Sequence, residues 1–111
     1  MSTVTVTPGA LITLDPSDKK VFLFDFDDVN LAVGATLTSY VLTITAIKQI
    51  GLTALTKDND ALAGSNRKVT ARLLATTATL GDRYRVAVKG VTSESPVQEK
   101  EYSIEILIQD H

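Results

Sequence analysis

Three carboxylates around the end of one hydrophobic segment are the side chains of this chain best suited to chemistry. Asp25, Asp27 and Asp28 lie at the end of the run Val21–Phe26 and directly after it. A carboxylate can act as a nucleophile, and a second one nearby can move a proton. Carboxylates are also preferred ligands of Ca²⁺. In a third interpretation, Asp25 and Asp28 only fix the turn that follows a core strand.

The segment Val21–Val29 resembles the nucleophile motif of haloacid-dehalogenase-type phosphatases. That resemblance would make Asp25 the group that attacks phosphorus and Asp27 the group that moves the proton. The family continues with alternating helices and parallel strands, whereas the hydrophobic period downstream here is two. The chain is also too short for that fold, so the turn interpretation is favoured.

A calcium loop is the second alternative for the acidic turn. The EF-hand pattern needs Asp or Asn at its fifth position, but counting from Asp25 places Val29 there, and counting from Asp58 places Leu62 there. A looser calcium loop and solvated turn acids both stay open.

The sequence lacks the residues and motifs that other common catalytic sites require. His111 is the single histidine and is the last residue, and the chain has no cysteine. No Gly-x-Ser-x-Gly elbow and no glycine-rich phosphate loop is present. We therefore expect a protein that is not an enzyme, with no cofactor and no metal.

Five cations at alternate positions form a candidate binding surface. They are Lys68, Arg72, Arg83, Arg85 and Lys89. On two adjacent strands they would gather on one face and could bind nucleic acid or an acidic partner. The favoured alternative is a ladder of charges across strands: if Val88 opposes Tyr102, then Lys89 opposes Glu101, and Arg85 opposes Glu105.

Composition predicts the elements that carry these residues. The chain has 111 residues with a net charge of −2, and 15 Thr, 11 Val and 7 Ile are β-branched. Such residues favour strands, and the length favours one domain. The charge argues against nucleic acid as a partner. No apolar run is long enough to span a membrane, and the start lacks a signal peptide, so we expect a soluble, non-exported protein.

Alternation of apolar and polar residues is clearest in the last two predicted strands. Tyr84, Val86 and Val88 face inward in the first, and in the second Tyr102, Ile104, Ile106 and Ile108 do so. Closely spaced strands joined by Gly, Pro, Asn and Asp predict an all-β fold, an antiparallel immunoglobulin-like β-sandwich of seven or eight strands.

The middle of the chain is harder to assign. Residues 57–60 and 64–66 predict a polar connection, and Leu52–Leu55 a weak strand. A bulge is expected near Thr38. Residues 71–80 are expected to form a strand followed by a loop, with a helical turn as the alternative.

The expected organisation is an N-terminal arm or edge strand over residues 1–19 and a sandwich over residues 20–111. The arm could add a strand to a neighbouring molecule. Leu74 and Leu107 interrupt the polar faces of their strands, and we expect these faces to be adjacent and to form a contact surface. The candidate interface residues are Val4, Val6, Leu11, Leu14, Arg72, Leu74, Arg83, Arg85 and Leu107.

Several segments in order resemble a family of small immunoglobulin-like virion structural proteins of tailed bacteriophages. The matching segments are Asp25–Asp28, Leu31–Ser39, Val69–Leu73, Gly81–Val86, Val91–Ser93 and Ser103–Ile106, and the resemblance covers residues 20–109. Tyr40 stands where that family often has Trp.

The resemblance implies a non-enzymatic virion component, made in the bacterial host cytoplasm. It would decorate or stabilise the capsid or belong to the head–tail neck, docking in many copies. Its partners would be major capsid or neck and tail proteins, with self-association as a further expectation and no membrane contact. The alternative is an immunoglobulin-like adhesion module that binds a surface or a carbohydrate.

Overall fold

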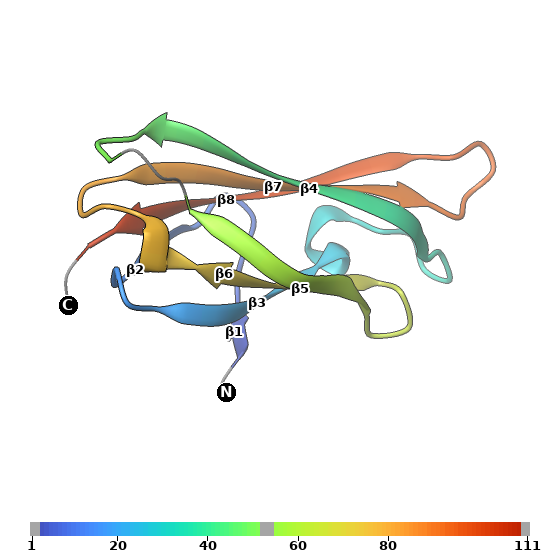
Figure 1. Cartoon of the computed structure of the whole chain (residues 1–111). Helices are drawn as coiled ribbons and strands as arrows, with labels where there is room; N and C mark the ends of the chain where they lie inside the picture. Colours follow the sequence, from blue (N-terminus) through green and yellow to red (C-terminus); the bar gives the residue numbers. More distant parts are fainter. Residues whose placement is uncertain (1–2, 52–54, 110–111) are drawn as a thin grey trace.

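The chain folds into two layers of β-sheet that face one another (Figure 1). The computed structural model describes residues 3–51 and 55–109. Within them the strands are β1 (Thr3–Thr5), β2 (Leu11–Leu14), β3 (Lys19–Asp25), β4 (Leu37–Lys48), β5 (Thr56–Ala63), β6 (Lys68–Leu74), β7 (Arg83–Thr92) and β8 (Glu99–Ile108). Two short 3₁₀ helices, η1 (Phe26–Val29) and η2 (Ala75–Thr77), follow β3 and β6.

Each sheet has four strands. One has the order β1-β3-β6-β5 and the other β2-β8-β7-β4. The prediction of an all-β sandwich is confirmed, but the prediction of purely antiparallel sheets is wrong. Strand β1 pairs in parallel with β3, and β2 pairs in parallel with β8. The first two strands thus lie at the edges of different sheets.

The core lies between the sheets and consists of the inward faces that alternation predicts. Val69, Ala71 and Leu73 of β6 are buried. The other residues expected to face inward, and the three phenylalanines of the chain, are also buried: Phe22, Phe24, Phe26, Tyr84, Val86, Val88, Tyr102, Ile104, Ile106 and Ile108. The Phe24 and Tyr102 rings pack in a T-shaped arrangement with their centroids 5.4 Å apart.

Two expectations for the middle of the chain change. Residues 57–60 belong to strand β5 and not to a connection. Their polar residues misled the prediction because β5 is an edge strand, with a register shift between Asp58 and Ala61 where Asn59 adopts a positive φ of 51°. The strand expected at the start of residues 71–80 is confirmed and ends at Leu74, but η2 occupies the first part of the expected loop.

Of the two remaining expectations for this region, the bulge is confirmed and most of the weak strand lies outside the described residues. The bulge expected near Thr38 is confirmed by the register shift between Leu37 and Ser39. Leu55 is buried outside any strand, and the rest of the predicted Leu52–Leu55 strand lies outside the described residues. The described residues also contain no apolar helix of the length needed to cross a bilayer.

Gly90 of β7 gives the core one position with no room for a side chain. A Cβ atom there would lie 2.8 Å from Leu37 Cδ2 and 2.9 Å from Phe26 Cε2. We expect Gly90→Ala to lower the free energy of unfolding by about 1–3 kcal/mol, because both neighbours must shift. Urea denaturation measures it, and a variant as stable as the natural chain would contradict this packing.

Candidate functional site

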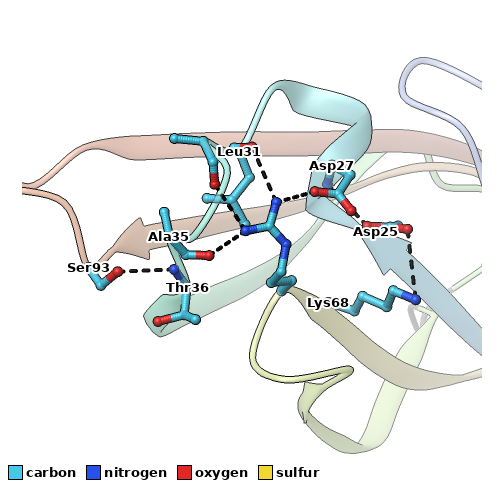
Figure 2. Close-up of polar contacts among 9 residues, drawn as sticks. Asp25, Asp27, Leu31, Ala35, Thr36, Lys68 and Ser93 are labelled. Carbon is cyan, nitrogen blue, oxygen red and sulfur yellow. Dashed lines mark hydrogen bonds and ion pairs between the residues drawn. The ribbon is translucent and has the colours of Figure 1, made fainter.

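The acidic turn is built at the junction of β3 and η1, and its carboxylates are engaged within the protein (Figure 2). The Asp25 side chain caps η1, accepting from the Asp27 backbone N–H at 3.1 Å. Its other oxygen lies 3.9 Å from Lys68 Nζ. The Asp27 carboxylate pairs with Arg67. The two carboxylates of the phosphatase hypothesis are therefore a helix cap and the partner of an arginine.

Arg67, between β5 and β6, organises the loop that follows η1. Its guanidinium pairs with the Asp27 carboxylate and donates to the carbonyl oxygens of Leu31 at 3.3 Å and Ala32 at 3.0 Å, and to that of Ala35 (Figure 2). One side chain thus holds several points of the segment 31–35. We call this arrangement the Arg67 clasp.

The clasped loop is also tied to both neighbouring turns. The Thr36 backbone N–H donates to the Ser93 hydroxyl at 3.0 Å, and the Ser93 N–H donates back to the Thr36 carbonyl at 2.8 Å. The Leu37 N–H donates to Asn66 O at 2.7 Å. Val33 at the loop tip is fully exposed, beside an open hollow lined by Asp27, residues 33–36, Ser65 and Arg67.

Asp28 belongs to a different network, which reaches the N-terminal segment. The buried Tyr102 hydroxyl lies 2.6 Å from the Val6 carbonyl oxygen and 3.2 Å from Asp28 Oδ2, both of which accept from it. Burial, followed by the charge of Asp28, raises the pKa of Tyr102 above its usual value. Asp28 therefore connects η1 to β8, whereas Asp25 makes the local bond that the turn interpretation predicted. Among residues 3–51 and 55–109, no cluster of three or more His, Asp or Glu side chains could hold a metal.

The five cations do not form one stripe. Lys68 and Arg72 lie on β6 in one sheet, whereas Arg83, Arg85 and Lys89 lie on β7 in the other, so the prediction of a single cationic face is wrong. Strands β6 and β7 are consecutive in sequence, but the chain crosses between the layers after η2. Alternation within a strand cannot report such a crossing.

The predicted charge ladder is present on β7 and β8. Lys89 opposes Glu101 and Arg85 opposes Glu105, so the predicted register is confirmed. The ion pairs, however, run diagonally: Arg83 Nε donates to Glu105 at 2.6 Å and Arg85 to Glu101 at 3.0 Å. Lys89 Nζ lies 3.1 Å from Glu99. Arg83 and Lys89 each reach a carboxylate two residues from the position directly opposite, and Arg85 reaches one four residues away.

Arg72 is engaged on the other sheet. Its guanidinium donates two hydrogen bonds to the Asp58 carboxylate of β5, and Nε lies 2.7 Å from Oδ1. Hydrogen bonding to Arg72 lowers the pKa of Asp58 and raises that of Arg72. The three arginines among the candidate interface residues therefore all have carboxylate partners.

The apolar interface candidates lie in different environments. Val6 and Leu14 are buried, Val4 is half-buried, and Leu11 is 52% exposed. Leu74 and Leu107 are half-buried on the outer faces of different sheets. The expectation that these two leucines lie on neighbouring faces is therefore wrong, for the same crossing between layers.

An open groove runs between β4 and β5, where the two sheets present their edges side by side. It is lined by residues 38–42 of β4 and by Lys57, Asp60 and Leu62 of β5. The Tyr40 hydroxyl donates to Asp60 at 2.8 Å, and Lys57 Nζ lies 2.9 Å from the same carboxylate. Burial and the bond to Asp60 raise the pKa of Tyr40 to about 12, while the bond from Lys57 lowers the pKa of Asp60.

No known family model and no curated protein sequence matches this chain. At the acidic turn, Asp25 and Asp27 pair with Lys68 and Arg67, and Asp28 accepts from Tyr102. The bonds from Arg67 hold the loop 31–35 in place.

Two structural residues were not foreseen from the sequence. Arg67 stands in a polar segment with no periodicity, so no pattern pointed to the loop it holds. Asp82 looked like an ordinary turn residue, yet it is fully buried and accepts at least three hydrogen bonds. An acid next to Gly81 just before a strongly alternating strand was the available signal.

The Arg67 clasp predicts a local effect. We expect Arg67→Ala to lower the free energy of unfolding by about 1–3 kcal/mol, since it removes charge-assisted bonds to carbonyl oxygens and to Asp27. Faster amide hydrogen exchange at Ala35 and Leu37 measures the loosening. Arg72→Ala is the matched control, because its guanidinium bonds Asp58 of β5 and should leave those amides unchanged. Unaltered exchange in the Arg67 variant would contradict the clasp.

Proposed function

We propose that this protein is a non-enzymatic structural component of a tailed bacteriophage virion, with an immunoglobulin-like sandwich that docks in many copies on the head or at the neck. The observation that carries the proposal is the ordered resemblance of residues 20–109 to that family. The resembling segments supply both the central strands and the clasped loop, which supports a role in which shape and surface matter.

The strand order supports the immunoglobulin-like part. That fold places strands A, B, E and D in one sheet and C, F and G in the other. Taking β1, β3, β6 and β5 as A, B, E and D makes β4, β7 and β8 the strands C, F and G, with β2 added beside β8. Tyr84, near the start of β7, donates its hydroxyl to Asp82 two residues upstream, which resembles the tyrosine corner of the fold. The parallel pairing of β1 with β3 is a departure from it.

The engagement of the charged groups supports docking over catalysis. Asp25 caps η1, Asp27 holds Arg67, and Asp28 accepts from Tyr102. A nucleophile in a phosphatase would need a carboxylate free to reach its substrate. Asp25→Asn, assayed with magnesium and a generic phosphate ester, tests this: an activity that the substitution abolishes would overturn the non-enzymatic proposal.

The adhesion alternative finds less support in the distribution of aromatic rings. Carbohydrate sites commonly present an exposed ring, but the three phenylalanines, Tyr84 and Tyr102 are fully buried. Tyr40, the sixth aromatic residue, is half-buried and bonded to Asp60.

The test is the protein's presence in virions and its binding to their parts. We expect mass spectrometry of purified particles to detect the chain, and the purified protein to saturate either protein-free heads or isolated tails. Leu74→Asp and Leu107→Asp form a matched pair, because these leucines lie on opposite outer faces. Loss of binding in one and not the other identifies the docking face. Absence from virions, or binding to neither part, would overturn the proposal.

A further inference from the structure

Strand β4 has an outer edge with which no strand formed by residues 3–51 and 55–109 pairs. It is the last strand of its sheet and runs for twelve residues (Figure 1). Its segment Leu37–Ile47 contains no charged residue, no proline and no glycine. An edge strand has backbone N–H and C=O groups that point away from the sheet, ready to pair with another strand. Val41 and Ile47 are 64% and 52% exposed on this strand.

The other sheet edges formed by the described residues carry the usual protection. Strands β1 and β2 are only three and four residues long. Strand β5 has a register shift between Asp58 and Ala61 and three charged side chains, Lys57, Asp58 and Asp60. Short length, bulges and charges all discourage pairing with another chain. β4 has a bulge only near each end, so its centre is open.

We propose that the free edge of β4 pairs antiparallel with the β4 edge of a second copy of this chain, around a two-fold axis near Thr43. The two sheets then join into one sheet of eight strands, with the two β4 strands at its centre. The inference rests on the sheet edge alone and is independent of the proposed virion role.

The charge pattern of the outer face favours a second copy as the partner. On this sheet, β7 carries cations, β8 carries anions, and β4 presents Val41, Thr43 and Thr45. A two-fold axis places each residue near its own copy, so a charged row would repel itself. The uncharged row, which belongs to β4, is the one that lies at the free edge of the sheet. Pairing about Thr43 brings threonine opposite threonine, and Val41 opposite Thr45, which are favourable cross-strand pairs.

The length of the β4 edge determines how strongly we expect the two copies to associate. At about 3.4 Å per residue, the segment Leu37–Ile47 spans roughly 37 Å, against a longest molecular dimension of 44 Å. Alternate backbone groups of both strands give on the order of ten hydrogen bonds across the pair. A contact one strand wide is at the small end of specific interfaces, so we expect a reversible dimer that forms as concentration rises.

Sedimentation equilibrium over a wide concentration range tests the proposal. We expect the apparent mass to rise from the 11.9 kDa of one chain toward twice that value. Thr43→Lys should abolish the rise, because it places like charges beside each other at the axis. Mixing Thr43→Lys with Thr43→Glu should restore dimers. Thr56→Lys is the matched control, an exposed threonine on the edge strand of the other sheet, and should dimerise normally.

Cysteine cross-linking places the contact residue by residue. The chain has no cysteine, so single introduced thiols report only their own contacts. Opposed residues of antiparallel strands lie within the Cα separation that a disulfide spans. We expect Thr43→Cys to form a covalent dimer on mild oxidation, and Thr56→Cys to stay monomeric. A protein that is monomeric up to about millimolar concentration, or a dimer that Thr43→Lys leaves intact, would overturn the proposal.

Discussion

Asp82→Ala is expected to lower the free energy of unfolding by about 3–5 kcal/mol, because it leaves several buried hydrogen-bond donors unpaired at once. Asp82 is fully buried. Its carboxylate accepts from Ile50 N at 2.7 Å, Thr79 N at 3.0 Å and the Tyr84 hydroxyl at 2.6 Å. These donors belong to three segments, so alanine would leave each of them without its acceptor. Chemical denaturation measures the loss.

Glu101→Ala is the control for removing a carboxylate as such. Glu101 pairs with Arg85 on the exposed ladder, where ion pairs contribute less than about 1 kcal/mol. Similar losses of unfolding free energy in the two variants would contradict the role of Asp82 as a buried acceptor of several hydrogen bonds. Asp82→Asn should fall between them, since the amide keeps the shape but presents donors to the donors around it.

The same residue predicts how stability changes with pH. Burial alone would raise the pKa of Asp82, but the bonds from Tyr84, Ile50 and Thr79 outweigh it and hold the pKa below its usual value. Its stabilising contribution is therefore complete above the unfolded value of about 3.9 and is lost as the pH falls through the folded value. Asp58 and Asp60 act in the same direction.

Denaturation between pH 2 and 7 measures this dependence. We expect the natural chain to lose stability below about pH 4, and Asp82→Asn to lose less over the same interval. Equal slopes would contradict the lowered pKa. At the alkaline end, burial and the bond to Asp82 raise the pKa of Tyr84 to about 12, so its contribution is complete below about pH 10 and is lost as the pH rises through about 12.

Ile104→Ala is the second large expected effect, a loss of about 2–5 kcal/mol. Ile104 is 1% exposed in β8 and lies opposite Val86 of β7, so truncation leaves a cavity between the two sheets. Ser103→Ala is the matched control, because Ser103 precedes it on the same strand and faces outward. We expect that control to change stability by less than about 0.5 kcal/mol. An Ile104 variant within that limit would mean that the core is centred elsewhere.

The sequence predicts best where alternation is strong. β7 and β8 could be paired residue by residue, because apolar and charged positions alternate over most of both strands and a slip of one place would bury charges. β5 could not be predicted, because an edge strand with a bulge tolerates charged residues such as Lys57, Asp58 and Asp60. Its residues are typical of a turn.

Long-range placement was beyond the sequence. Which of two sheets a strand joins depends on packing between layers, and nothing in β6 or β7 encodes that they separate. The roles of the acidic turn were partly predictable, since Asp25 and Asp28 were expected to fix it. The partner of Asp27 was not, because Arg67 lies 40 residues away along the chain.

The parallel pairing of β2 with β8 has a consequence for biosynthesis. Leu11 of β2 pairs with Glu105 of β8, so β2 cannot enter its sheet until more than 90 further residues have been made. Contacts this distant in sequence are slow to form because the closing of the loop between them costs entropy. The sandwich therefore completes its fold only after β8 has been synthesised, and Leu14 of β2 lacks its β8 partner in the nascent chain until then.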